Sequence, residues 1–460
     1  MIPARAKPFR LTMVHPCVGR RRGMRGYIRT WQMEPLPVAT LAALCPPDIE
    51  RRFYDDRLES IPFDEPCDLV AMSVETYTAR RAYQIASEYR RRGVPVVMGG
   101  FHATLCPDEV GRYADSVVIG EAEALFPQVI EDWRHGRGQW VYRSPQRPRS
   151  LHIMPDRSLF VGKRYLPISL VETARGCAFS CEFCAITAAF KATQNRAPIE
   201  RVIEELRRLK RPRRLFFFVD DNIVSNLAGA KELFRALIGE GIRWVGQASS
   251  NVAWDEECLD LMKRSGCQGV LIGFESLDPE QLAQMNKSWN LARGGPAGAL
   301  ANLRRHGLRV YGTFIFGYDH DTEASFDQAV DFARDQGMFI AAFNHLTPFP
   351  GTPLYTRLEA AGKLRFPAWW LDADYRYGMA PFTPERLSPQ RLEQLCTAAR
   401  RRFYGWPSIF SRARHKIHWQ DPWMLMNFLV INAMHRSDVV GRNRLPLGDE
   451  AWNGTLLEVG

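Results

Sequence analysis

Short apolar runs alternate with stretches of helical spacing over the first 145 residues. The β-branched-rich runs lie at residues 10–14, 50–54, 69–74, 94–98 and 116–119. Helical stretches are expected at residues 36–44, 78–92 and 107–113, and in the second of them Ala82, Ile85, Ala86 and Tyr89 recur near the helical period. Such alternation predicts a parallel sheet covered by helices on both faces.

Residues 165–357 repeat a strand-then-helix pattern about six times. The expected strands are residues 169–173, 215–219, 244–248, 269–273, 310–316 and 339–345. Helical pieces are expected at 198–209, 227–238, 256–265, 297–305 and 323–336. Repeated βα units with right-handed crossovers close toward a parallel barrel, and six units predict an open, partial (β/α)6 barrel of the TIM type.

The pattern changes again after the barrel, becoming aromatic and mainly helical. Pro389 after Ser388 marks a helix start, and Arg400 to Arg402 close that helix. We therefore expect four parts: a first domain at 1–145, a linker at 146–164, the barrel at 165–357 and a helical extension at 358–460. The extension either buttresses the barrel or shapes a substrate pocket, and aromatic helices allow both interpretations.

Composition and charge narrow the classes of protein only slightly. Of 460 residues, 46% are hydrophobic and 24% charged, which excludes a wholly disordered or fibrous chain. The net charge of +10 could attract nucleic acid, an acidic electron donor or anionic lipid, although solvated basic faces are the simpler explanation. No signal peptide or apolar run long enough for a transmembrane helix is present, and ten cysteines in a chain of this kind argue against a disulfide framework.

Three cysteines follow the first barrel strand. Cys177, Cys181 and Cys184 have the spacing Cys-x3-Cys-x2-Cys, directly after Gly176. Thiolates hold iron–sulfur clusters, and three in a short loop can grip one cubane. The same spacing would also place three buried cysteines on one face of a helix. The position at the end of a barrel strand, where active sites of such barrels lie, favours the cluster.

This cysteine motif, with the aromatic Phe183 before its last member, resembles the signature of the radical S-adenosylmethionine (radical SAM) enzymes. The resemblance implies a [4Fe-4S] cluster whose open iron binds SAM, and reductive cleavage of SAM to a 5′-deoxyadenosyl radical. It further implies SAM-binding positions at later strand ends, although Gly312 and Gly317 are one residue further apart than usual. The implied positions are Phe183, Asp220, Asp221, Gln247, Ser249, Glu275, Gly312 and Gly317.

The first domain has ligand-friendly residues after its third, fourth and fifth strands, where ligands of such sheets bind. Paired glycines and hydroxyls there resemble the flavodoxin-like (Rossmann-like) cobalamin-binding domain that precedes many radical SAM barrels. The implied contacts are Ser73, Thr76, Tyr77, Gly99, Gly100, His102, Gly120 and Glu121. The familiar Asp-x-His-x-x-Gly motif is absent, and His15 after the first strand does not reproduce it. The lower cobalt ligand is therefore left open.

The two domains together resemble the branch of hopanoid C-methylases and anaerobic Mg-protoporphyrin cyclases. This implies a cytoplasmic C-methyltransferase acting on an unactivated carbon of a small or lipidic metabolite, with a flavodoxin- or ferredoxin-type electron donor. A cyclase, ring-contracting or oxidising enzyme of the same architecture is the alternative. A tRNA methylthiotransferase is disfavoured because no basic RNA-binding domain follows the barrel, so nucleic acid is not an expected partner. A cobalamin-binding sensor would leave the three cysteines without a role.

Overall fold

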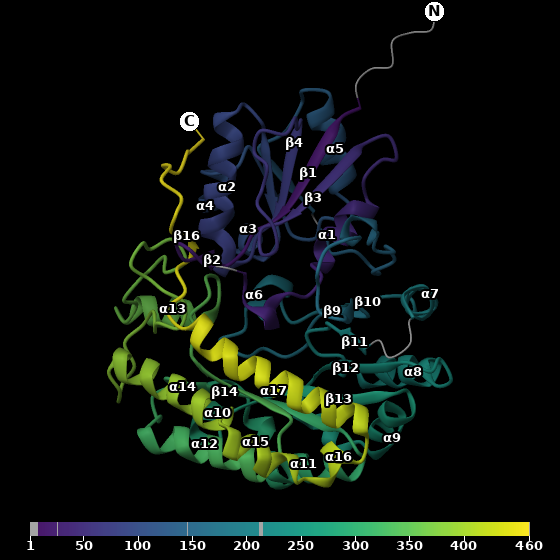
Figure 1. The fold of residues 1–460 in the computed structure, drawn as a ribbon, viewed down its shortest axis with the longest axis vertical. Helices are drawn as coiled ribbons and strands as arrows, with labels where there is room; N and C mark the ends of the chain where they lie inside the picture. Colours follow the sequence, from purple (N-terminus) through teal and green to yellow (C-terminus); the bar gives the residue numbers. More distant parts are fainter. Residues whose placement is uncertain (1–7, 25, 145, 211–214, 460) are drawn as a thin grey trace, which may run out of the picture.

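The computed structural model describes residues 8–24, 26–144, 146–210 and 215–459, and these form two lobes joined at a broad junction (Figure 1). The first lobe is built on a six-stranded parallel sheet in the order β3-β1-β4-β5-β6-β7. Its strands are β1 (Arg10–His15), β3 (Glu50–Asp55), β4 (Leu69–Ser73), β5 (Val96–Gly99), β6 (Ser116–Ile119) and β7 (Val141–Arg143). Taken in chain order this is the flavodoxin-like arrangement, whose order reverses between β1 and β4.

Helices cover both faces of this sheet, as the alternating pattern predicts. One face packs with α2 (Ala79–Arg91) and α4 (Pro107–Gly111) through a core that includes Met72, Ile85 and Val110. The other face packs with α1 (Leu36–Ala43) and α5 (Phe126–Arg134) through Val38 and Ile130. A short helix, α3 (Phe101–Leu105), follows β5 directly.

The second lobe contains a six-stranded parallel sheet in the order β15-β14-β13-β12-β11-β8. The strands are β8 (Ile168–Val171), β11 (Leu215–Phe218), β12 (Arg243–Ala248), β13 (Cys267–Glu275), β14 (Arg309–Phe316) and β15 (Ile340–His345). Helices α7 (Ile199–Leu209), α8 (Leu227–Leu237), α9 (Glu256–Arg264), α11 (Gly295–Arg305) and α12 (Glu323–Asp335) connect them. Because β8 and β15 form the two edges, the barrel is open, as its six repeats predict.

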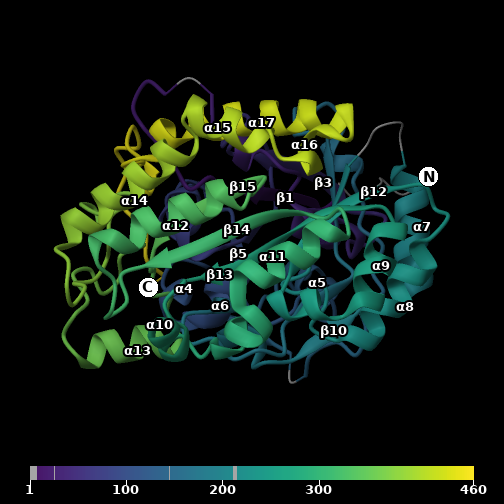
Figure 2. The ribbon, with the colours of Figure 1, turned by 90° about the horizontal axis from the view of Figure 1, so that it is seen from below.

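Apart from its first helix, the C-terminal extension adds a helical layer along one side of the barrel (Figure 2). Its helices are α13 (Pro353–Ala360), α14 (Pro389–Phe403), α15 (Trp406–Ala413), α16 (Lys416–Trp419) and α17 (Pro422–Arg442). α14 packs on β15 and α12, where Tyr404 donates a hydrogen bond to the carbonyl of Ala341. None of the described helices is long and apolar enough to cross a membrane.

The extension does not end on the barrel. After α17 the chain returns to the first lobe, where β16 (Gly448–Asp449) pairs with β2 (Gly19–Arg20). The last described residues then run beside α2 and α4 (Figure 1), and Arg112 forms an ion pair of 2.6 Å with Glu458. The C-terminal segment therefore fastens the two lobes to each other, a role that its aromatic pattern did not predict.

Candidate active site at the junction of the two domains

The three cysteines lie in a loop that leaves the first barrel strand. This loop runs between two short antiparallel strands, β9 (Ala174–Gly176) and β10 (Gln194–Arg196), and α6 (Ala185–Phe190) begins immediately after Cys184. The helical interpretation of the cysteine spacing is thereby excluded. Gly176 has φ +91°, and a Cβ there would lie 2.2 Å from the carbonyl oxygen of Thr193, so only glycine fits this position.

Hydrogen bonds and an ion pair from three directions hold the cysteine loop in place. The Gly176 amide donates to Asp221 Oδ2 at 2.8 Å, and the Ala178 amide donates to Ser225 Oγ at 2.9 Å. On another side Asn286 donates to Ser180, and Arg357 of α13 pairs with Glu182 at 2.8 Å. A loop fixed in this way can present its thiols without collapsing around them.

The thiols are close enough to influence one another. Burial raises the pKa of Cys181 to about 11, while the ammonium of Lys287 acts to lower it and the charges of Cys184, Glu275 and Cys177 act to raise it. Among the described residues no three acidic, histidine or cysteine side chains converge on a single ion position. Each thiolate of a cubane binds a different iron, so the three cysteines need not meet at one ion position.

A buried polar chain connects the cysteine loop to the neighbouring strand ends. Asn222, after β11, places Nδ2 3.8 Å from Cys177 Sγ and 3.0 Å from Ser249 Oγ. At the end of β13, Glu275 has φ +64° and its carboxylate pairs with Lys287 at 2.9 Å and accepts from Thr313 at 3.1 Å. A non-glycine residue in the left-handed region is costly, and such strain is concentrated at functional sites.

Lys287 also lies beside the aromatic residue of the cysteine motif. Its Nζ is 6.0 Å from the centre of the Phe183 ring and 5.3 Å from that of Trp289, while Trp289 stacks on Phe179 of the loop. The Glu275–Lys287 pair therefore places one negative and one positive charge at the edge of the cysteine loop. A ligand that carries an amino group and a carboxylate needs both of these charges.

The two neighbouring aspartates after β11 divide into two roles. Asp220 is buried and accepts from the amide and hydroxyl of Thr173, so it braces the end of β8; its burial raises its pKa to about 7. Asp221 holds the Gly176 amide and lines the cavity described below, and burial raises its pKa to about 6. Only Asp221 of the pair faces open space.

Of the other expected SAM positions, Gln247 lies near the end of β12, partly exposed, and its carbonyl accepts from the Ile223 amide. The two expected glycines, Gly312 within β14 and Gly317 directly after it, turn away from the barrel interior. A Cβ on Gly312 would meet Met338 at 2.5 Å, and one on Gly317 would meet Phe382 at 2.7 Å, both in the surrounding hydrophobic layer. Alternation along the strand explains the direction of Gly312, because Thr313 and Ile315 occupy the opposite face of β14.

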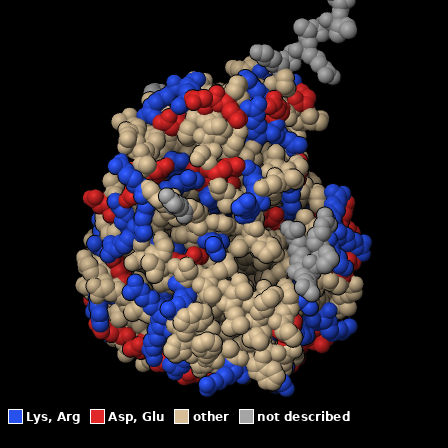
Figure 3. All heavy atoms as spheres, in the orientation of Figure 1, with Lys and Arg blue, Asp and Glu red and all other residues tan. Residues whose placement is uncertain are grey.

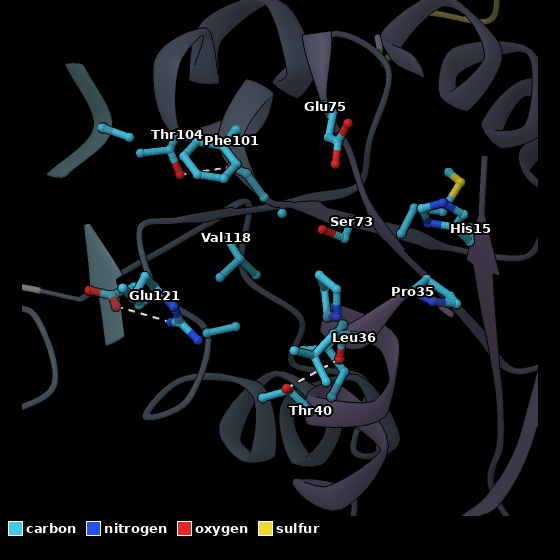
Figure 4. A pocket seen from close by; sticks show the side chains of 18 of the residues that line it. His15, Pro35, Leu36, Thr40, Ser73, Glu75, Phe101, Thr104, Val118 and Glu121 are labelled. Atoms are coloured by element: carbon cyan, nitrogen blue, oxygen red, sulfur yellow. Dashed lines mark hydrogen bonds and ion pairs between the residues drawn. The ribbon is translucent and has the colours of Figure 1, made fainter. Parts of the chain in front are cut away.

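A cavity of about 940 Å³ lies between the two lobes (Figure 4). It is bounded by the carboxyl ends of β1, β4, β5 and β6 on one side and by residues around β8, β9 and β11 on the other. From the first lobe Ser73, Tyr77, Gly99, Gly100, Gly120 and Glu121 line it, and from the barrel Leu170, Glu172, Arg175, Val219 and Asp221. The cavity therefore joins the expected cobalamin region to β9, the strand that leads into the cysteine loop, while the three cysteines themselves lie outside its lining.

The cavity extends into the first lobe as an apolar slot between the sheet and α1. Val97 and Val118 form its sheet side, and Leu41 and Leu44 its helix side. Gly120, with φ +87°, leaves open space where a Cβ would stand, whereas Gly100, with φ +96°, is required because a Cβ would lie 2.8 Å from Ser73 Oγ. A deep slot beneath a wide opening fits a large flat ligand that carries a tail, as cobalamin does.

Two ionisable side chains face the upper end of the cavity in Figure 4. Burial lowers the pKa of His15 to about 4, so its imidazole is neutral, and burial raises the pKa of Glu75. Both line the cavity. A neutral imidazole can accept a hydrogen bond or bind a metal.

Two expected cobalamin contacts, His102 and Thr76, lie outside the cavity lining. His102 is fully buried, with Nε2 3.0 Å from Glu109 and its ring against Trp370, so it belongs to the domain core and does not line the cavity. Thr76 is also buried outside the cavity lining, and Thr104 of α3 lines it instead. The position after Gly100 begins a helix, and that turn directs His102 inward.

Glu121 lines the cavity, but its carboxylate is held by cations from the junction. Arg147 approaches it at 2.7 Å and Arg175, two residues before Cys177, at 3.0 Å. Arg175 also pairs with Glu123 and Glu172, so one guanidinium joins three carboxylates from the two lobes. This cluster positions the strand that carries the cysteine loop against the first lobe.

Asn222, Lys287 and the slot residues of α1 were not among the site residues predicted from the sequence. Asn222 directly follows the two aspartates after β11, and that position was the available signal. Lys287 is a lone basic residue in an otherwise polar loop, and nothing in its sequence context marks it as buried.

Comparison with known proteins identifies the two domains. The radical SAM superfamily matches residues 171–333, and the B12 binding domain matches residues 38–130. The bacteriochlorophyllide d C-12(1)-methyltransferase of Chlorobaculum tepidum is 31% identical over 408 residues, which cover 86% of this chain and 88% of that enzyme. The anaerobic magnesium-protoporphyrin IX monomethyl ester cyclase of Rubrivivax gelatinosus is 25% identical over 63% of this chain and 57% of the cyclase.

The fold also matches a solved structure. The radical SAM methyltransferase TsrM of Kitasatospora setae, with cobalamin and a [4Fe-4S] cluster bound, superposes with a TM-score of 0.64 at 16% identity, over 94% of this chain and 99% of TsrM. The cysteine loop and the slotted cavity agree with both cofactors of that fold. The chain belongs to the cobalamin-dependent radical SAM methyltransferase family, as an enzyme that uses SAM, a [4Fe-4S] cluster and cobalamin.

Proposed function

We propose that this enzyme transfers a methyl group to an unactivated carbon of a small or lipidic metabolite. The observation that carries the proposal is the cavity between the two lobes. It joins the cobalamin-type slot of the first lobe to the strand that leads into the cysteine loop. In this family the cluster and SAM supply a carbon-centred radical and cobalamin supplies the methyl group. A reaction of this kind needs both cofactors to face one enclosed space.

The residues divide between the two cofactors as follows. Cys177, Cys181 and Cys184 would hold the cluster, on a loop that hydrogen bonds and the Glu182–Arg357 ion pair position. Phe183, Gln247, Ser249 and Glu275, joined by Lys287 and Asn222, surround SAM, with Asp221 at the cavity side. Ser73, Tyr77, Gly99, Gly100 and Gly120 would border the cobalamin, and Val97, Val118 and Leu41 line the slot that would receive its tail. Asp220, His102, Gly312 and Gly317 act through the packing of their neighbours.

The electron for SAM cleavage comes, in our proposal, from a flavodoxin or ferredoxin. Both are acidic carriers in general, and the net charge of +10 favours their approach. We also propose a cytoplasmic location, since the chain's ten cysteines are free and the cluster requires a reducing compartment.

A cyclase of the same architecture is the second candidate, favoured by the similarity to the magnesium-protoporphyrin cyclase. Both reactions begin with hydrogen abstraction and form 5′-deoxyadenosine. Only methyl transfer also forms S-adenosylhomocysteine and a product heavier by one CH2.

An anaerobic assay of the reconstituted enzyme with SAM and a strong reductant tests the proposal. A bacteriochlorophyllide is the first substrate to supply, because the similar Chlorobaculum enzyme is named for one. We expect a methylated product together with 5′-deoxyadenosine and S-adenosylhomocysteine. The triple variant with Cys177, Cys181 and Cys184 changed to Ala should form neither nucleoside product, whereas the control Cys258→Ala, in α9, should form both. Formation of 5′-deoxyadenosine with a desaturated or cyclised product, and no S-adenosylhomocysteine, would replace methyl transfer by the second candidate.

A further inference from the structure

Large apolar side chains are exposed on one part of the molecule. Ten such side chains are exposed among the described residues, and seven of them lie between residues 406 and 440. They are Trp406, Phe410, Trp419, Met426, Leu429, Val430 and Val440. Single exposed apolar residues are ordinary, but a concentration of this kind marks an interaction site.

The first six of these side chains lie on α15, α16 and α17, three helices that contact one another, and we call their exposed surface the α15–α17 face. Trp406 and Phe410 lie one turn apart on α15 with their rings 5.9 Å apart, and Phe410 is 58% exposed. Met426, Leu429 and Val430 lie on one side of α17, and Trp419 ends α16 between the two helices. In the space-filling view the corresponding region is a broad uncharged area with Lys and Arg at its margin (Figure 3).

Basic side chains outnumber acidic ones in the segment that carries this face, and of them Arg402 pairs with Asp327 and Asp331 of α12. Residues 394–437 contain seven Lys or Arg but a single Asp, Asp421, which caps α17 by accepting from the Trp423 and Met424 amides. Arg401, Arg414, Lys416 and Arg436 are exposed, and within the described chain no acidic side chain forms an ion pair with them. Arg436 lies over the Trp406 ring at 5.5 Å, so a cation stands directly beside the apolar surface.

We propose that the α15–α17 face binds the surface of a membrane that contains anionic lipid. Aromatic side chains partition into the interface between headgroups and acyl chains, and surrounding cations are attracted to acidic headgroups. A second copy of the chain is the less favoured occupant, because a two-fold contact would bring these unpaired cations against one another. The described helices do not span a membrane, so the binding is peripheral.

The face is connected to the cavity through α17. Asp438 near the end of this helix accepts hydrogen bonds from the amide and hydroxyl of Thr30, and Arg442 lies 5.1 Å from the Trp31 ring. Trp31 in turn packs edge-on against Tyr377 at 5.1 Å, and both rings line the cavity. Membrane contact on the outside of α17 is therefore placed to deliver an amphiphilic substrate to the junction.

Vesicle flotation with the reconstituted holoenzyme tests the proposal. We expect the enzyme to float with vesicles of phosphatidylglycerol and phosphatidylcholine, weakly with phosphatidylcholine alone, and less at high salt. Combining Phe410→Ser, Trp419→Ser and Met426→Ser should lower the apparent affinity by about tenfold or more. The matched control Val161→Ser with Leu457→Ser removes exposed apolar side chains elsewhere and should bind as the unaltered enzyme does.

A second pair of variants separates charge from apolar contact. Lys416→Glu with Arg436→Glu should abolish the preference for phosphatidylglycerol, whereas Arg137→Glu with Arg149→Glu, on the exposed surface of the first lobe and linker, should keep it. SAM cleavage without vesicles should be the same in all variants, which shows intact folding independently of the methylation reaction. The proposal is overturned if the enzyme does not float with vesicles, or if it binds neutral vesicles equally well. It is also overturned if sedimentation velocity shows a concentration-dependent dimer that is lost in the triple apolar variant.

Discussion

Glu275 and Lys287 show how single residues at the strand ends set the chemistry of the site. Both side chains are nearly inaccessible, at 7% and 8% exposure, and their charged groups are 2.9 Å apart. A buried pair of this kind is costly to separate, since either partner alone would be an uncompensated charge. The pair is maintained although Glu275 has a strained backbone, which indicates that its position matters for more than stability.

Replacing Lys287 should therefore weaken SAM binding more than it weakens the cluster. In Lys287→Met we expect about tenfold lower SAM affinity with unchanged iron content, because Glu275 loses its cationic partner while the three thiols stay in place. Equilibrium dialysis of the anaerobic holoenzyme measures this. Lys263→Met removes an exposed lysine as the control, and equal SAM affinity in both variants would contradict the assignment.

Asp220 makes stability depend on pH. Its folded-state pKa is about 7 against an ordinary value of 3.8, so between these values the folded chain holds a proton that the unfolded chain has released. The free energy of unfolding should then fall as pH rises from about 4 to about 7. Urea unfolding of the cluster-free protein should show a smaller fall for Asp220→Asn than for the unaltered chain or for the exposed control Asp374→Asn. An equal fall in all three would show that Asp220 does not cause it.

At the scale of elements, helix ends are fixed by local sequence. Ser388 accepts a hydrogen bond from the Arg391 amide at 3.2 Å and Pro389 opens α14, as the Ser-Pro pair predicts. α14 packs on β15 and α12, so the stability of this helix contributes to the packing at the β15 edge of the barrel.

Ser388→Ala should lower the free energy of unfolding by about 1 kcal/mol, because the α14 amide loses its acceptor. Ser388→Asp keeps an acceptor and should stay within a few tenths of a kcal/mol of the unaltered chain. Chemical denaturation measures both. A loss of the same size in the two variants would assign the effect to packing rather than to the cap.

Elements with strong periodicity were predictable, and those made by distant pairing were not. All six barrel strands and five strands of the first sheet (β1, β3, β4, β5 and β6) begin and end within two residues of the expected positions. The strands β7, β9, β10 and β16 have only two or three residues, too few for a period, and exist because a partner strand lies beside them. The sequence did not predict the direction in which His102 and Gly312 face. His102 follows an expected strand, but the turn into α3 directs it into the core. Gly312 lies within an expected strand, but alternation directs it away from open space.

At the scale of the whole molecule, one arginine joins the two lobes. Arg175 contacts Glu121 at 3.0 Å and Glu123 at 2.7 Å in the first lobe, and Glu172 at 2.7 Å in the second. Removing its charge leaves three carboxylates close together beside the cavity.

Arg175→Met should lower the free energy of unfolding by about 3 kcal/mol and reduce the cobalamin retained after gel filtration. The first effect follows from unpaired buried charge, and the second from displacement of Glu121 in the cavity wall. Arg334→Met, which removes a more exposed arginine of α12, is the control for both measurements. Full cobalamin retention by Arg175→Met would show that the junction does not shape the cofactor site.

The most direct test of the cluster and cobalamin assignments is the metal content of the anaerobically reconstituted protein, measured together with its absorbance spectrum. One cubane on the cysteine loop and one corrinoid in the cavity predict about four irons and one cobalt per chain. Iron without cobalt would contradict methyl transfer in the cavity between the two lobes. Protein with neither metal would contradict the assignment of the cysteine loop and this cavity as the active site.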